Sequence, residues 1–128
     1  MKELKFLYCP VCKKLALEVI ESEAPAMCCG KEMKVLKANS TDAAGEKHVP
    51  VVEVKDNIVK VTVGSVIHPM SEEEHHISFV AVLFDDGSYA FKELNHVGDP
   101  IAEFPIGNAK PVAAYEFCNL HGLWKVEL

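Results

Sequence analysis

The residues of this chain that are best suited to chemistry are its cysteines and histidines, and they fall into two groups. Four of the five cysteines lie within the first 29 residues, whereas the fifth cysteine and all six histidines lie beyond residue 47. Thiolate sulfur and imidazole nitrogen are common protein ligands of zinc, iron and copper. The separation predicts two sites of different chemistry in two structural units.

The first group consists of Cys9, Cys12, Cys28 and Cys29. Two residues separate Cys9 from Cys12, so that one tight turn can aim both sulfurs at a single ion. Adjacent residues of a strand face opposite ways, so Cys28 and Cys29 can share that ion only if the backbone bends, and Gly30 supplies the freedom to bend. Four thiolates suit a tetrahedral zinc or a mononuclear iron, and the spacing leaves the choice of metal open.

Two other interpretations of these cysteines carry less weight. Four buried cysteines without a metal would leave a unit of about 36 residues with almost no core to hold it folded. A thioredoxin-type redox pair at Cys9 and Cys12 would need a surrounding βαβ pattern, which the sequence lacks. Metal binding is therefore the prediction.

The second group is spread over three segments of the chain. It comprises His48, His68, the adjacent His75 and His76, and a C-x-x-H pair formed by Cys118 and His121. Imidazoles and one thiolate that converge on one ion would suit iron, copper or zinc, and a thiolate donates electron density to iron. Taken singly, each histidine also fits a hydrogen-bonded residue of the surface or core, and His96 keeps that interpretation.

Short strands, rather than helices, must position both groups. Residues 6–8, 15–20 and 33–36 have the composition of strands, and a small polar linker follows at 37–45. β-Branched and aromatic residues then recur, with Asp, Asn, Gly and Pro between them, at 49–54, 59–63, 77–84, 88–94, 112–117 and 123–126. No amphipathic helix interrupts them, so the sequence predicts an all-β protein whose larger part is an antiparallel β-sandwich.

Charge and composition argue against some functions. Nineteen acidic residues outnumber thirteen basic ones, and this net charge of −6 argues against binding to nucleic acid or to an anionic membrane. No apolar run is long enough to cross a bilayer, and the first residues, MKELKFLYC, resemble no export signal. We therefore expect a cytoplasmic protein, in which cysteines stay reduced and serve as ligands or reactive groups.

Together the motifs resemble the desulfoferrodoxin family, the two-iron form of superoxide reductase, over nearly the whole chain. Residues 9–12 and 28–30 resemble its small desulforedoxin-type domain, which holds one iron with four cysteines. The segments that resemble its immunoglobulin-like catalytic domain are Ser40-Thr41-Asp42, Glu46-Lys47-His48-Val49-Pro50, Gly64-Ser65-Val66, His68-Pro69-Met70 and Cys118-Asn119-Leu120-His121-Gly122. The resemblance implies a desulforedoxin-like domain at residues 1–37 and an immunoglobulin-like antiparallel β-sandwich at residues 38–128.

The resemblance also implies which residues hold and serve the catalytic iron. Four equatorial imidazoles and one axial cysteine would come from His48, His68, one of His75 and His76, His121 and Cys118. Glu46 is implied as an occasional further ligand of the oxidised iron. Lys47 is implied as the positive charge beside the position where superoxide binds.

The choice between His75 and His76 depends on alignment to the strand that follows. The stretch 71–74 is one residue longer than is usual in the family before this ligand. Counting back from the apolar residues 77–80 places the ligand at His75. Because adjacent strand residues face opposite ways, we predict His75 rather than His76.

These resemblances imply a superoxide reductase that reduces superoxide to hydrogen peroxide and is re-reduced by an external donor such as rubredoxin. Its cofactors would be two non-haem irons per chain, and the family implies a homodimer. Whether the four-cysteine iron relays electrons or only holds its domain together is left open. Two alternatives stand beside this hypothesis: an electron carrier that uses the four-cysteine centre alone, and a zinc-ribbon binding module. Metal content and reactivity toward superoxide distinguish the three.

Overall fold

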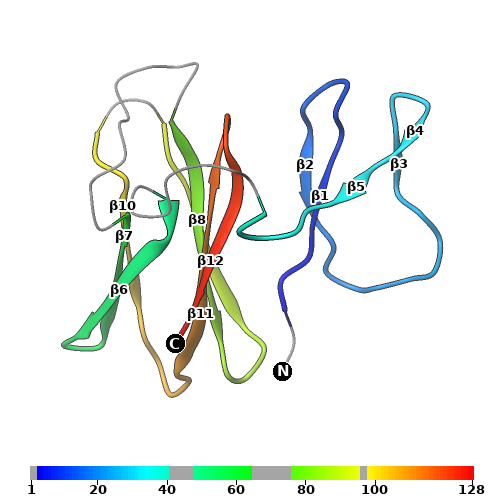
Figure 1. Cartoon of the computed structure of the whole chain (residues 1–128). Helices are drawn as coiled ribbons and strands as arrows, with labels where there is room; N and C mark the ends of the chain where they lie inside the picture. The colour runs from blue at the N-terminus through cyan, green and yellow to red at the C-terminus, as the bar shows by residue number, and fades with distance from the viewer. Residues whose placement is uncertain (1–2, 41–47, 65–75, 96–97) are drawn as a thin grey trace. The chain divides into compact units, whose positions relative to one another are not determined.

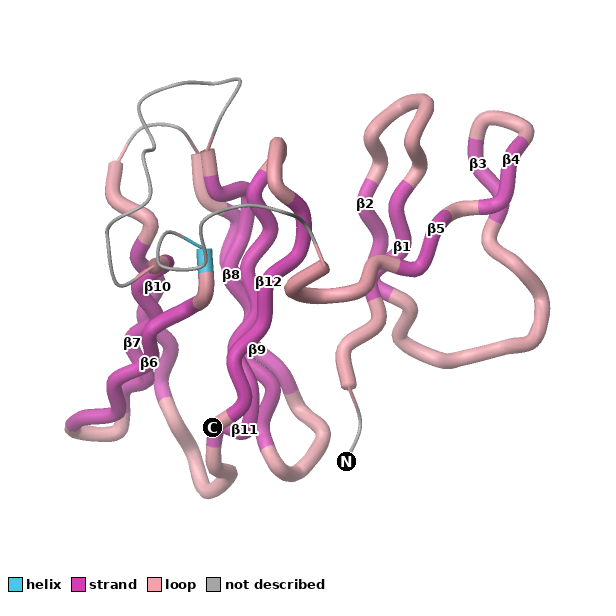
Figure 2. Tube along the Cα trace, in the orientation of Figure 1, coloured by secondary structure: helices cyan, strands magenta, loops and turns pink. Residues whose placement is uncertain are grey.

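The structure, a computed structural model, describes residues 3–40, 48–64, 76–95 and 98–128 of the chain. Apart from one helical residue, His48, the elements within these ranges are β-strands, and the chain divides into two units, Met1–Lys37 and Ala38–Leu128 (Figures 1 and 2). The prediction of an all-β fold is confirmed. In the described part of the chain there is no helix of the length and apolarity that a membrane span requires.

The first unit is a small sheet with an additional hairpin. Strand β1 (Phe6–Tyr8) pairs antiparallel with β2 (Leu15–Leu17) and with β5 (Lys34–Val35), while β3 (Met27–Cys28) pairs with β4 (Lys31–Glu32). One core cluster consists of Leu7, Cys9 and Met33, with three partly buried neighbours, and Leu4 and Phe6 are also buried. A core of this size contributes little stability, so the unit depends on what its cysteines bind.

In its described residues, the second unit is a sandwich of two antiparallel sheets with seven strands. One sheet has the order β10 (Ile101–Pro105), β7 (Ile58–Val63), β6 (Pro50–Lys55). The other has the order β12 (Gly122–Glu127), β11 (Pro111–Cys118), β8 (Ile77–Phe84), β9 (Tyr89–Glu93). The chain crosses between sheets after β7 and after β9, and again after β10, as in immunoglobulin-like sandwiches.

The core of the sandwich follows from the period-two pattern of its strands. In β7, Val59, Val61 and Val63 are fully buried, whereas the intervening Lys60 and Thr62 are not. The buried valines form one cluster with inward-facing residues of the opposite sheet: Ile77, Val80, Val82, Phe84, Ala114 and Cys118. Cys118, a predicted metal ligand, therefore sits at the edge of the main hydrophobic core.

Three short strands lie outside the segments that the sequence pattern identified. β3 and β4 have two residues each, too few to show a period. β10 is an edge strand that ends at Pro105, a residue that usually argues against a strand. At an edge, however, the missing N–H of proline leaves no ladder hydrogen bond unmade, so the strand forms.

The pairing of strands brings the ligand-bearing segments of the sandwich to one end. Cys118 is the last residue of β11, where it pairs with Ile77 at the start of β8 and with Gly122 at the start of β12. His121 lies in the short loop between β11 and β12, and His48 lies just before β6. Segments far apart in sequence thus meet at one edge of the two sheets.

Candidate metal centres

The first pair of cysteines lies in the tight loop that joins β1 to β2. The Lys13 N–H donates to the Cys9 carbonyl and the Cys9 N–H donates to the Lys14 carbonyl, both at 2.9 Å, and Lys13 has a left-handed φ of 69°. These bonds close the loop so that the Cys12 N–H points to the Cys9 Sγ, 3.5 Å away. The loop therefore holds the two sulfurs close together.

The second pair of cysteines lies at the turn of the β3–β4 hairpin. Cys28 pairs with Lys31, which leaves Cys29 and Gly30 as a two-residue turn, and both have positive φ, 52° and 73°. Positive φ at both central residues is the mark of a type I′ turn. Two adjacent cysteine ligands require a bend in the backbone, which the sequence predicted at Gly30. The structure has this bend at both Cys29 and Gly30.

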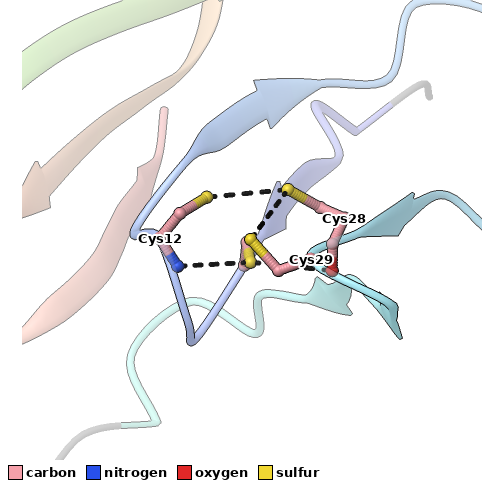
Figure 3. Close-up of side chains that lie close together, drawn as sticks. Cys12, Cys28 and Cys29 are labelled. Carbon is pink, nitrogen blue, oxygen red and sulfur yellow. Dashed lines mark hydrogen bonds between the residues drawn. The ribbon is translucent and has the colours of Figure 1, made fainter.

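The four sulfurs lie close enough to hold one ion. All four are within 4.8 Å of one another, with Cys12 Sγ 3.6 Å and Cys29 Sγ 3.9 Å from Cys28 Sγ (Figure 3). A tetrahedron of sulfurs about 2.3 Å from its centre has edges of about 3.8 Å, so these separations fit a tetrahedral metal. The predicted ligands Cys9, Cys12, Cys28 and Cys29 are thus brought together.

The electrostatics of the four thiols also favour a cation. The Cys12 N–H lowers the pKa of Cys9 to about 6, whereas hydrogen bonding with the Cys12 sulfur raises the pKa of Cys28 to about 12. The pKa of Cys29 is raised as well, chiefly by Cys12. Once Cys9 is ionised, Cys28 and Cys29 therefore resist losing their protons. A bound cation would favour their thiolate forms.

The second group of ligands gathers at the end of the sandwich. His48 Nε2 lies 3.1 Å from His121 Nδ1, and His121 Nδ1 lies 3.7 Å from Cys118 Sγ. His48 and Cys118 are buried, and the three ligand atoms lie within 4.8 Å of one another. Burial is the main cause that raises the pKa of Cys118, so the thiolate needs a nearby cation to form.

Trp124 holds both histidines in place and was not identified from the sequence. Its indole stacks on the His48 ring, with centroids 5.0 Å apart and planes at 21°, and its Nε1–H donates to the His121 carbonyl at 3.1 Å. Its place, six residues after Cys118 on the next strand, carries no motif that would reveal this role.

Glu116 is a second residue that the sequence analysis did not single out. It is fully buried, and neither carboxylate oxygen has a hydrogen-bond partner among the described residues. Burial raises the pKa of this carboxyl well above its ordinary value. A glutamate two positions before a predicted ligand on a strand faces the same way as that ligand, which is the signal that could have identified it.

The structure describes only some of the remaining predicted site residues. Glu46, Lys47, His68 and His75 lie outside the described residues, as does His96. His76 is described but is not part of the ligand group; its backbone exchanges hydrogen bonds with Asn119 instead. The assignment of a ligand to His75 therefore stays a prediction.

Comparison with known proteins agrees with these two groups. A family model described as Desulfoferrodoxin matches residues 40–127, which include all three described ligands of the second group. The chain belongs to the desulfoferrodoxin family. A desulfoferrodoxin homolog from Archaeoglobus fulgidus is 42% identical over 126 residues, covering 98% of each chain. A desulfoferrodoxin from Nitratidesulfovibrio vulgaris is 52% identical over 102 residues, covering 79% of this chain and 78% of its own.

The structural comparison extends the desulfoferrodoxin assignment to both units. The crystal structure of the superoxide reductase from Treponema pallidum matches with a TM-score of 0.82 and 37% identity, covering 98% of this chain and 100% of that one. The resemblance that the motifs indicated is thus confirmed. The prediction of two iron centres, one of cysteines and one of histidine and cysteine, is confirmed at the level of these donor groups.

Proposed function

We propose that this desulfoferrodoxin is a superoxide reductase. The observation that carries the proposal is the convergence of His48, Cys118 and His121 at the end of the sandwich. A similar chain of known structure, from Treponema pallidum, is a superoxide reductase. Iron held by this group would supply the electron that, with two protons, converts one superoxide into one hydrogen peroxide.

The chain's own residues hold the ligands and attract the substrate. Trp124 orients His48 by stacking and His121 by a hydrogen bond to its carbonyl. In this proposal His68 and His75 would complete a set of four histidines and one cysteine that holds the iron, and Glu46 would be a further ligand of the oxidised iron. Lys47 attracts the superoxide anion locally, because a charge acts within a Debye length of about 8 Å even on a protein of negative net charge.

The proposed reaction consumes an electron that must be replaced from outside the chain. A reduction, unlike a dismutation, yields no dioxygen from a second superoxide. An external carrier such as rubredoxin supplies the electron in this proposal, and the homodimer and the cytoplasmic location stay predictions.

The test is the stoichiometry of superoxide consumption by the chemically reduced protein. One hydrogen peroxide for each superoxide, without dioxygen, is expected; dioxygen released in equal amount to the peroxide would indicate dismutation and refute the proposal. Cys118→Ser keeps the size of the buried side chain but replaces the sulfur donor, so it should abolish the reaction. A serine variant that reduces superoxide at the normal rate would show that the cysteine assignment is wrong.

One observation favours a second candidate, an electron carrier that works through its four-cysteine centre alone. Cys12 and Cys29 are exposed, as the ligands of a centre that exchanges electrons with a partner would be. The same experiment distinguishes the two, because a carrier would show reversible redox chemistry at this centre and no consumption of superoxide.

A further inference from the structure

The charge of this acidic chain is divided unevenly between its two units. Residues 1–37 contain seven lysines and five glutamates, a net charge of +2. Residues 38–128 contain six lysines and fourteen acidic residues, a net charge of −8. The positive charge therefore belongs to the unit that carries the four cysteines.

Within the first unit, three of the seven lysines lie in the loops that carry the cysteines. The two loops that supply all four sulfurs, residues 9–14 and 28–31, contain Lys13, Lys14 and Lys31 and no acidic residue, and all three lysines are exposed. The long connection from β2 to β3, with its three glutamates, lies at the opposite end of the unit from the two cysteine-bearing turns (Figure 1). Glu32, one residue beyond Lys31, is the nearest acidic residue in sequence.

The same two segments combine exposed cysteines with exposed apolar side chains. Cys12 and Cys29 are exposed, and beside them Val11 and Met27 are 54% and 62% exposed. We call the surface that these residues contribute the lysine-rimmed face and define it by Lys13, Lys14, Lys31, Val11 and Met27 together with the exposed Cys12 and Cys29. A small apolar centre with a charged rim is typical of short-lived protein complexes, in which rim charges govern the rate of encounter.

We propose that the lysine-rimmed face is the docking site of an acidic one-electron carrier protein. The carrier gives up one electron and is oxidised, and that electron reduces ferric iron held by the four cysteines to ferrous iron; no proton or bond is exchanged. The proposal rests on the proposed function, which requires an external electron donor. Charge complementarity selects an acidic partner, and the exposed sulfurs give a reason for it to dock here rather than on the acidic sandwich.

The test measures the dissociation constant of the iron-loaded chain with an acidic rubredoxin and with an acidic flavodoxin, at low and at moderate salt. The test variant is Lys13→Glu, Lys14→Glu, Lys31→Glu. The matched control is Lys55→Glu, Lys92→Glu, Lys110→Glu, which changes three exposed lysines of the sandwich and shifts the net charge by the same amount. At low salt, the dissociation constant for at least one carrier should rise by about tenfold or more in the test variant, and this dissociation constant should depend much less on salt than that of the wild type. The control variant should change the dissociation constant far less.

Three outcomes would overturn the proposal. Equal weakening in both variants would show that net charge alone matters, and unchanged affinity with a shifted potential of the four-cysteine centre would show that the lysines only neutralise its thiolates. Salt-dependent self-association that disappears in the test variant would show that a second copy occupies the face. If the test variant fails to bind iron, the milder Lys13→Gln, Lys14→Gln, Lys31→Gln variant should show a smaller loss in the same direction, and no loss would refute docking here.

Failure of this proposal can be told apart from failure of the proposed function. The reaction of chemically reduced protein with superoxide needs no carrier, so the test variant should consume superoxide at the control rate. A chain that binds the carrier but does not consume superoxide would refute the proposed function and leave the docking site standing.

Discussion

Replacing Glu116 with glutamine should change how the stability of the sandwich depends on pH. Glu116 is fully buried on β11, where it lies opposite Val80 on one side and Trp124 on the other. Its carboxylate has no hydrogen-bond partner among the described residues, and burial raises its pKa well above the ordinary 4.5. Glutamine has nearly the same shape but cannot ionise, so the substitution isolates the effect of the charge.

The sign and size of the effect follow from proton linkage. A carboxyl whose pKa is raised in the folded state contributes most to stability below the unfolded-state pKa, and loses that contribution as pH rises toward the folded-state pKa. For each pH unit above 4.5, up to the folded-state pKa, the wild-type chain should lose about 1.4 kcal/mol relative to Glu116→Gln. The free-energy cost of burying the glutamine amide does not depend on pH, so it does not affect this slope.

The assay is urea unfolding of the metal-free protein at several pH values between 4 and 8. Trp124, the only tryptophan of the chain, lies in β12 and reports on the sandwich. Glu103→Gln, on the edge strand β10, is the matched control, because it removes an exposed carboxylate from the same unit. If the difference in the free energy of unfolding between wild type and Glu116→Gln stays constant with pH, the reasoning is refuted. Such a result would mean that the folded protein stabilises the charged form of Glu116.

Three further changes have expected outcomes. Gly30→Ala should weaken metal binding by roughly tenfold in a chelator competition, because a left-handed φ of 73° costs a non-glycine residue about 1–2 kcal/mol and the new methyl group meets no neighbour within 4 Å; unchanged affinity would show that the turn tolerates a side chain. Removal of the metal should unfold residues 1–37, whose core cluster has three buried residues, while the eleven-residue core cluster keeps the sandwich folded; limited proteolysis that spares the first unit would contradict this. Lys47→Ala should slow the second-order reaction with superoxide several-fold and flatten its ionic-strength dependence while iron stays bound, as rapid mixing would measure; an unchanged rate would remove Lys47 from the proposal.

The ligands that the sequence predicted best are those whose spacing restricts the backbone. Two residues separate Cys9 from Cys12, and two residues separate Cys118 from His121, and each pair spans a tight loop at the end of a strand. A short loop of this kind leaves few conformations, and nearly all of them aim the two side chains at one point. Sequence spacing is therefore enough to predict that each pair acts together.

Other features depend on contacts between residues that are far apart in sequence. The stacking of Trp124 on His48 joins residues at either end of the sandwich sequence, and no local pattern marks such a contact. β10 was missed for a related reason, because its pairing with β7 outweighs the strand-breaking tendency of Pro105. Both features arise from tertiary contacts, and in β10 such contacts override the local propensity. The local sequence of these segments therefore gave no sign of either feature.

A shift in strand register lies beside Cys118, at the start of β8. Phe117 pairs with Phe79, but the next residue, Cys118, pairs with Ile77, so Ser78 of β8 has no partner of its own on β11. Such a bulge bends the strand and re-aims the side chains beside it, and bulges are common next to functional sites. Here it keeps both Cys118 and Ile77 facing the core at the point where the sheet ends. The extra residue lies in β8, so the shift turns Ile77 toward the core while Cys118 keeps the regular alternation of β11. Since regular alternation is the basis of strand prediction, the sequence pattern could not have shown this inward position of Ile77.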